Sequence, residues 1–151
     1  MIRINCNLDL SGIQDLDTRM NNTLLSMIEL MAQSYVDEVK RDITQKHVID
    51  HGNLKNSFLV VRKFNGADVV SGVNYLWFQN DGTGVYGKKH RPIKPKRKKF
   101  LVFEIAGKTI FAKQVKGVKG QHFVEDALDK TEDPTNIANM LVTAMRMNGL
   151  I

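Results

Sequence analysis

The sequence predicts an α+β fold: a single domain in which an antiparallel-rich β-sheet is packed by a long N-terminal helix and by C-terminal helices, with a long basic loop. Three observations predict this class. Apolar residues recur every three or four positions over residues 15–46, two β-prone segments flank Asn65-Gly66, and helical patterns return after residue 120. A chain of 151 residues can bury one core, so residues 1–151 are expected to form one domain.

Two periodicities describe the N-terminal third. Residues 2–10 alternate apolar and polar, which predicts a strand with one buried face. Residues 15–46 then predict one face of a helix, formed by Leu16, Met20, Leu24, Met27, Met31, Tyr35, Val39 and Ile43. We expect the helix to end near His51-Gly52, where glycine can adopt the left-handed conformation. About 30 helical residues reach roughly 45 Å, which is more than one small domain needs, so we expect part of the helix to contact another subunit.

The middle of the chain predicts strands. Residues 57–64 and 67–73 are β-prone, and Asn65-Gly66 between them predicts a hairpin with a type I′ turn. Residues 75–79 are expected to continue as a strand, with Trp77 packed in the core or on the sheet. Another strand pair, residues 100–105 and 109–115, is expected around Ala106-Gly107-Lys108.

The C-terminal part predicts two helices. The first covers about residues 121–130, and the second starts at Asp133-Pro134, with the aspartate as N-cap and proline at the first helical position. The last helix should turn Ile137, Leu141, Val142 and Met145 inward and end at Gly149. The methionines are expected in the core, with an adaptable interface as the alternative: Met20, Met27, Met31, Met140, Met145 and Met147.

Positive charge is concentrated in one segment. The net charge is +6, and eight of the 22 basic residues fall within twelve positions, without an acid among them: Lys88, Lys89, Arg91, Lys94, Lys96, Arg97, Lys98 and Lys99. The remaining 14 basic residues face 16 acids. We therefore expect a near-neutral body with a flexible basic loop over about residues 80–99, which contacts either a phosphate backbone or an acidic groove of a neighbouring subunit. Aromatic residues are missing between Lys88 and Lys99, so sequence-specific reading of bases is not expected.

Two patterns resemble chemical sites. Residues 82–87 match the dinucleotide-binding pattern G-x-G-x-x-G, and Lys88-Lys89 nearly completes a phosphate-binding loop. Both sites need a helix to start at the last glycine, whereas Pro92 and Pro95 follow within a run of like charges, so a glycine-rich turn is the favoured interpretation. His47 and His51 have zinc-ligand spacing beside Asp50, but a third ligand is not evident. We therefore predict no catalytic residue, no metal and no cofactor, and hence no enzyme.

Other classes are excluded by composition. The chain has no run of 18 apolar residues, so no membrane span is expected, and its start lacks the pattern of a signal peptide. Cys6 is the only cysteine and cannot form an internal disulfide. We expect folding in a reducing cytoplasm.

Three segments resemble one family, the neck, tail-completion and head–tail joining proteins of tailed phages of the siphophage type. Residues 50–57 resemble its D-T-G-x-L-x-x-S segment, residues 75–84 its Y-A-x-F-x-E-x-G-T signature, and residues 121–128 its P-F-[LV]-x-x-A-L helix start. Threonine, alanine and proline are usual where this chain has His51, Leu76 and His122. The basic segment from Ile93 to Leu101 also recurs in such proteins. The matching positions are Gly52, Leu54, Ser57, Tyr75, Phe78, Gly82, Thr83, Gly84, Phe123, Ala127 and Leu128.

The resemblance, which covers about residues 15–130, implies a structural protein of the virion neck or tail that is made in the host cytoplasm. Such proteins assemble as rings of six subunits, or a multiple of six, and join the DNA-filled head to the tail. Their expected partners are copies of the same chain, neighbouring neck proteins and tail-tube or tail-terminator proteins, with non-specific contact to genome DNA. Two alternatives remain open from the residues alone: a non-specific nucleic-acid-binding module that uses the basic loop, and a small enzyme that uses the loop over residues 82–87.

Overall fold

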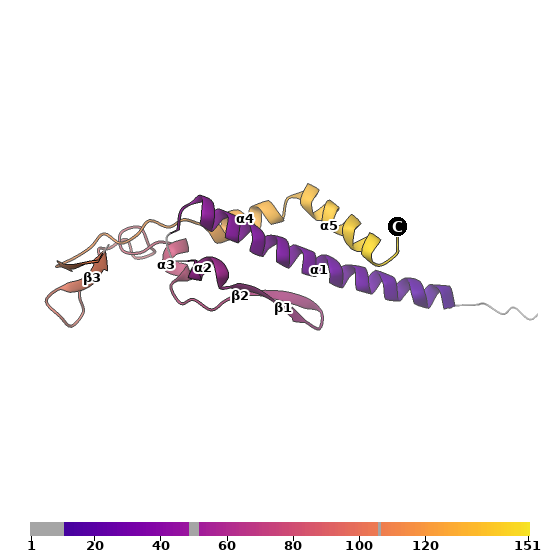
Figure 1. Cartoon of the computed structure of the whole chain (residues 1–151), viewed down its shortest axis with the longest axis horizontal. Helices are drawn as coiled ribbons and strands as arrows, with labels where there is room; N and C mark the ends of the chain where they lie inside the picture. The colour runs from indigo at the N-terminus through magenta and orange to yellow at the C-terminus, as the bar shows by residue number, and fades with distance from the viewer. Residues whose placement is uncertain (1–10, 49–51, 106) are drawn as a thin grey trace, which may run out of the picture.

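The computed structural model describes residues 11–48, 52–105 and 107–151. Its elongated body is built along one long helix, α1 (Ser11–Gln45) (Figure 1). The other described elements are α2 (Asn53–Asn56), β1 (Phe58–Lys63), β2 (Gly66–Ser71), α3 (Leu76–Asn80), β3 (Leu101–Ile105), β4 (Lys108–Ala112), α4 (Phe123–Thr131) and α5 (Pro134–Met147). The predicted α+β class is confirmed, whereas the strand expected over residues 2–10 lies outside the described residues.

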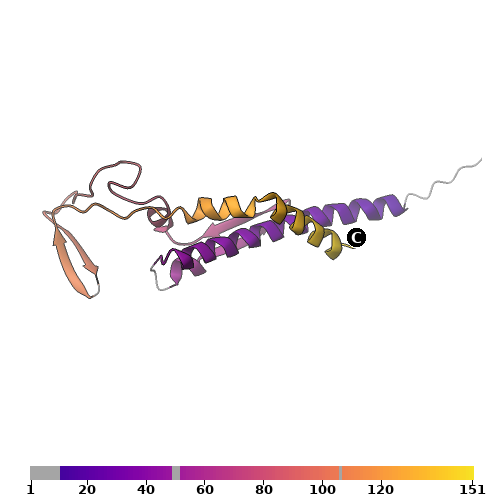
Figure 2. The ribbon, with the colours of Figure 1, turned by 90° about the horizontal axis from the view of Figure 1, so that it is seen from above.

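The elements pack on two sides of α1. Helices α4 and α5 follow one side, and the β1–β2 hairpin with α2 follows another (Figures 1 and 2). The β3–β4 hairpin lies at the end of the molecule opposite the start of α1. The expectation of one sheet is corrected, because the described strands form two separate antiparallel pairs. The long connection over residues 72–100 carries β3 and β4 away from the body, so they cannot hydrogen-bond to β1 or β2.

The core lies at the C-terminal half of α1. Val36, Val39 and Ile43 are at most 3% exposed. They pack against buried residues from the shorter elements: Leu54, Phe58, Leu76, Phe123 and Ala127. Burying these side chains supplies the main driving force for folding, about 1.5–3 kcal/mol for each large apolar side chain.

The N-terminal half of α1 differs from its prediction. Leu16, Met20 and Leu24 belong to the apolar face, yet they are 49%, 53% and 56% exposed. Helix α5 ends near this region, where the Arg19 guanidinium donates to the Gly149 carbonyl at 3.0 Å. With 35 residues, α1 is about 52 Å long, and in the described structure its first turns extend beyond their neighbours (Figure 1). Met20 and Met147 are likewise exposed rather than in the core.

Helix α1 ends earlier than predicted, at Gln45 instead of near residue 51. His47 takes a left-handed conformation (φ 48°), and its amide donates to Thr44 while the Val48 amide donates to Ile43. These two hydrogen bonds form a Schellman motif, with histidine at the position where glycine is usual. Val48 then packs against the core.

The first hairpin is confirmed, but its turn is not the predicted one. Lys63 pairs with Gly66, so Phe64 and Asn65 form the two-residue connection. Neither residue has a positive φ, which excludes a type I′ turn. The register follows the core instead, because it turns Val60 and Val69 towards α1. The second hairpin is confirmed, and Gly107 in its turn has φ 75°.

The strand predicted over residues 75–79 is a short helix, α3. Leu76 and Asn80 are one helical turn apart and are both buried, whereas the next side chain, Trp77, points outward. A run of apolar residues this short does not distinguish a strand from a helix by periodicity. The packing of Leu76 in the core decides in favour of the helix.

The two C-terminal helices are confirmed. The Asp133 side chain caps α5 by accepting from the amides of Thr135 and Asn136. The inward face of α5 differs in part from the prediction, because Ala144 is its buried residue and Leu141 and Val142 are 38% and 37% exposed.

Candidate functional site

The basic loop begins where two distant segments cross. The Thr83 amide donates to the Val118 carbonyl and the Val85 amide to the Lys116 carbonyl, both at 2.8 Å. The Thr83 hydroxyl accepts from the Val118 amide at 2.9 Å. Further along, Ile93 and Val115 exchange both backbone hydrogen bonds, at 2.9 and 3.0 Å. Residues 82–93 are thus attached to residues 115–118 by their backbone.

Glycine is required at this crossing because the chains approach so closely. A Cβ atom on Gly84 would lie 2.1 Å from the Lys116 carbonyl oxygen, and one on Gly117 would lie 2.2 Å from that of Thr83. Both glycines also have positive φ, 65° and 94°. The G-x-G-x-x-G pattern therefore serves the packing of two chain segments. Helix α4, the next helix in the chain, begins only at Phe123, so Gly87 does not start the helix that a phosphate-binding loop needs.

A buried amide fixes the start of the loop to α4. The Asn80 side chain is fully buried, and its nitrogen donates to the two Glu125 carboxylate oxygens at 3.0 and 2.9 Å. Its oxygen accepts from the Val124 amide at 3.0 Å. The same nitrogen reaches Asp81 at 2.9 Å, and hydrogen bonds from Asn80 and then Lys88 hold the pKa of Asp81 below its usual range. This amide therefore joins α3, the loop and α4.

The structure gathers five of the eight predicted loop cations around one groove of about 830 Å³ between α3 and the loop. They are Lys88, Lys89, Arg91, Lys94 and Lys96. All five are exposed, and within the described residues only Lys88 forms an ion pair, with Asp81 at 3.2 Å. Like charges gathered in this way attract an anionic partner.

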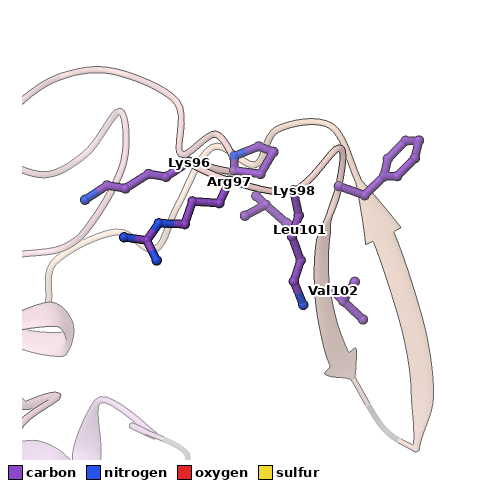
Figure 3. A pocket seen from close by; sticks show the side chains of 7 residues that line it. Lys96, Arg97, Lys98, Leu101 and Val102 are labelled. Carbon is purple, nitrogen blue, oxygen red and sulfur yellow. The ribbon is translucent and has the colours of Figure 1, made fainter.

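The other three predicted cations lie elsewhere. Arg97 and Lys98 border a second hollow of about 510 Å³, where the loop meets β3. Figure 3 shows Lys96 and Arg97 extending away from the hairpin, whereas Lys98 extends alongside β3, near Leu101. Lys99 is exposed and lines neither hollow. The predicted flexibility of the loop stays a prediction.

Sequence reasoning missed the aromatic wall of the larger groove. Trp77, predicted to pack in the core or on the sheet, is 57% exposed and lines the groove together with Phe78, which is 60% exposed. Both come from α3, outside the segment between Lys88 and Lys99. Reading Leu76 and Asn80 as one buried helical face would have placed these two aromatics outside it.

The three segments that carry the family resemblance meet in the fold. Leu54, Tyr75, Phe123 and Ala127 lie in or against the same core cluster. The Ser57 hydroxyl supports the start of β1 by donating to the Leu54 carbonyl at 2.7 Å. Gly82, Thr83 and Gly84 form the chain crossing, Gly52 precedes α2 with φ 81°, and Phe78 and Leu128 are exposed.

The histidine pair considered for zinc is only partly described. His47 lies beyond the end of α1, while Asp50 and His51 fall outside the described residues. Within residues 11–48, 52–105 and 107–151, no three His, Cys, Asp or Glu side chains gather as metal ligands. The described helices include none that is long and apolar enough to cross a membrane.

Comparison with known proteins finds no matching family model, no matching curated protein and no matching solved structure.

Proposed function

We propose that this protein is a structural component of the virion in tailed phages, a subunit of the neck or tail-completion ring that joins the DNA-filled head to the tail. The observation that carries the proposal is that an exposed apolar helix face and a basic groove lie towards opposite ends of one elongated chain. Figure 1 shows the start of α1 and the β3–β4 hairpin at these two ends. One end presents an exposed apolar helix face, and the other presents a basic groove without enough acids to neutralise it. Neither the exposed apolar face nor the uncompensated positive charge is needed for folding, so both surfaces suggest contacts with partners.

The apolar end suits contact with another protein. Leu16, Met20 and Leu24 follow each other at four-residue steps on α1 and are each about half exposed. Contiguous exposed apolar patches mark protein–protein interaction sites when they are large, and these three side chains can form part of such a patch. We assign this row to the contact between neighbouring subunits of the ring.

The exposed area of the chain supports assembly. The whole chain exposes 11819 Å², whereas a compact monomer of 17.1 kDa exposes about 7,700 Å². The 14 residues outside the described ranges can account for at most about 2,300 Å² of the difference. The described part therefore exposes more surface than a compact domain of its size, as expected for a protomer that is completed by its neighbours.

The resemblance to neck and tail-completion proteins gives the proposal its specific form. Ring subunits of that family number six or a multiple of six, and a ring multiplies each weak contact of the basic loop. The partners are then copies of this chain, the adjoining neck proteins and a tail-tube or tail-terminator protein. The ring also lies beside the path of the genome, where positive charge favours non-specific contact with DNA. The protein acts in the virion after synthesis in the host cytoplasm, and its role requires neither cofactor nor catalysis.

A second candidate is a non-specific nucleic-acid-binding module without a role in the virion. The unpaired cations of the groove favour it. It predicts that the isolated monomer binds any duplex, with an affinity that falls steeply as salt is raised. Assembly into a ring is not part of this candidate, so the two proposals differ in the oligomeric state that they require.

The test of the neck proposal replaces Lys94, Lys96, Arg97 and Lys98 by serine in the phage or prophage that encodes the chain. Because these side chains are exposed, the variant should fold, and electron microscopy should show heads and tails that fail to join or heads that lose their DNA. A control with equal loss of charge replaces four exposed lysines outside the loop: Lys108, Lys113, Lys116 and Lys119. Normal infectious particles from the loop variant would contradict the role assigned to the loop.

A further inference from the structure

The groove between α3 and the basic loop combines two kinds of side chain that the sequence keeps apart. Its cations come from residues 88–96 and its aromatics, Trp77 and Phe78, from α3. Each aromatic side chain exposes more than half of its surface. Exposed aromatics beside unpaired cations are the two components of surfaces that bind single-stranded nucleic acid, where bases stack on rings and phosphates contact the cations.

We infer that this groove binds single-stranded nucleic acid, with a base stacked on Trp77 and the neighbouring phosphates held by the four cations without an ion pair in the described structure, Lys89, Arg91, Lys94 and Lys96. The charge of the groove supports this ligand, because its one acid, Asp81, already pairs with Lys88. The remaining four cations have no ion-pair partner in the described part of the chain. An anion with about four charges matches them, and a nucleic-acid strand supplies one charge with each nucleotide.

The aromatic side chains favour a single strand over the other polyanions. A duplex hides the faces of its bases, so Trp77 and Phe78 would add little to its binding. An acidic protein segment would use the cations alone. Stacking on an aromatic ring tolerates every base, so we expect no sequence preference. The sequence led to the same expectation, because the basic segment between Lys88 and Lys99 has no aromatic residue that could read individual bases.

Hydrogen bonds fix the backbone on both sides of the groove. Asn80 joins the end of α3 to α4 through hydrogen bonds of 2.9–3.0 Å to Glu125 and Val124. On the opposite side, Ile93 is paired with Val115. The aromatic wall and the start of the basic wall are therefore positioned before a ligand arrives.

Trp77 is the only tryptophan of the chain, so its fluorescence reports directly on the groove. The probe is an oligothymidylate of about 12 nucleotides, a length within the site sizes of single-strand grooves. We expect saturable quenching of Trp77, and an affinity that falls with salt with a log–log slope of about −3. Duplex DNA, inorganic polyphosphate and poly-glutamate of similar length should bind more weakly and leave the fluorescence nearly unchanged.

Variants separate stacking from charge. Binding of a labelled oligothymidylate, measured by anisotropy, should weaken at least about fivefold in Trp77→Ala and should be restored in Trp77→Phe. Lys89→Ser combined with Lys94→Ser should reduce the salt slope by about 1.4. The matched control, Lys98→Ser with Lys99→Ser, removes the same charge outside the groove and should reduce the slope less. Circular dichroism confirms that each variant is folded.

Poly-glutamate that binds as tightly as oligothymidylate would overturn the inference in favour of an acidic protein partner. Unchanged Trp77 fluorescence on adding oligothymidylate would also overturn it, because no base would then stack on the ring. The inference adds a ligand to the loop that the proposed function uses for assembly, but it does not require that function. Loss of head–tail joining in the loop variant together with an unresponsive Trp77 rejects only the single-strand site. Normal particles together with a quenched Trp77 reject only the neck role.

Discussion

The centre of the molecule and its basic end are held together by different interactions. The centre depends on apolar side chains of α1, α2 and α4 that are almost fully buried. The basic end depends on backbone hydrogen bonds between residues 82–93 and 115–118 and on glycines that let these segments approach. A region built from backbone contacts leaves its side chains exposed, and here those side chains include the cations of the groove. The comparison indicates that the centre carries most of the stability, whereas the basic end leaves its charged side chains exposed for the contacts that we propose.

The largest effect should come from the centre. Phe123→Ala removes a fully buried ring from the core and should destabilise the protein by about 3–5 kcal/mol, measured by urea unfolding. The control is Phe64→Ala in the first hairpin, where the ring is 92% exposed. That variant should stay within about 0.5 kcal/mol of the natural protein. Similar losses at the two positions would contradict the assignment of the core.

The second largest effect on stability should come from Asn80, which connects α3 and the basic loop to α4. Asn80→Ala leaves the Glu125 carboxylate and the Val124 amide without the Asn80 partners that they contact in the structure. We expect a loss of about 1–3 kcal/mol in thermal or urea unfolding. The matched control is Asn74→Ala, since the Asn74 side chain is exposed. An Asn80→Ala protein as stable as this control would show that α3 is held by Leu76 alone.

The far end of α1 should affect assembly rather than folding. Replacing Leu16, Met20 and Leu24 by glutamine keeps helix propensity and removes the exposed apolar row. Each replacement should change the free energy of unfolding of the monomer by less than about 0.5 kcal/mol. Light scattering after size exclusion should show that the proposed ring no longer assembles. Asn22→Gln, on another face of the same helix, is the control. A ring that survives the triple replacement would move the subunit contact to another surface.

The smallest effect concerns acid. The hydrogen bond from Lys46 holds the pKa of Asp126 below its usual value of 3.8, so the carboxylate is charged in the folded protein at a pH where the unfolded chain is already protonating. Its stabilisation is therefore present above about pH 4 and is lost as the pH falls through the folded pKa. Thermal unfolding from pH 6 to pH 3 should show a shallower decline in Asp126→Asn than in the natural protein. If the melting temperatures of the two proteins fall in parallel with pH, the Lys46–Asp126 ion pair does not contribute to the loss of stability in acid.

Local patterns predicted a large part of the fold. The helical conformation of α1, the second hairpin and the Asp133 cap of α5 depend on residues close in sequence, and the structure confirms them. The buried face of α1 is confirmed only in its C-terminal half. The failures involve distant contacts. The helix over residues 76–80 forms because Leu76 enters a core built by α1 and α4, and the first turn shifts because α1 fixes the register of its hairpin.

The candidate site likewise combines features that local sequence predicts with features that distant contacts determine. The charge of the basic segment could be read directly from the sequence. The groove could not, because it needs the crossing of residues 80–87 with 115–121 and the outward rotation of Trp77. The crossing depends on backbone hydrogen bonds between distant segments, and the orientation of Trp77 depends on the burial of Leu76 and Asn80. The sequence does not distinguish a buried asparagine such as Asn80 from an exposed one.

The neck proposal implies that a tailed phage or prophage encodes the chain, and electron microscopy of its particles with this gene deleted tests the proposal most directly. If the chain joins head to tail, the preparation should contain DNA-filled heads and finished tails as separate objects, and supplying the natural protein should restore complete particles. Intact particles in the absence of the gene would contradict that role.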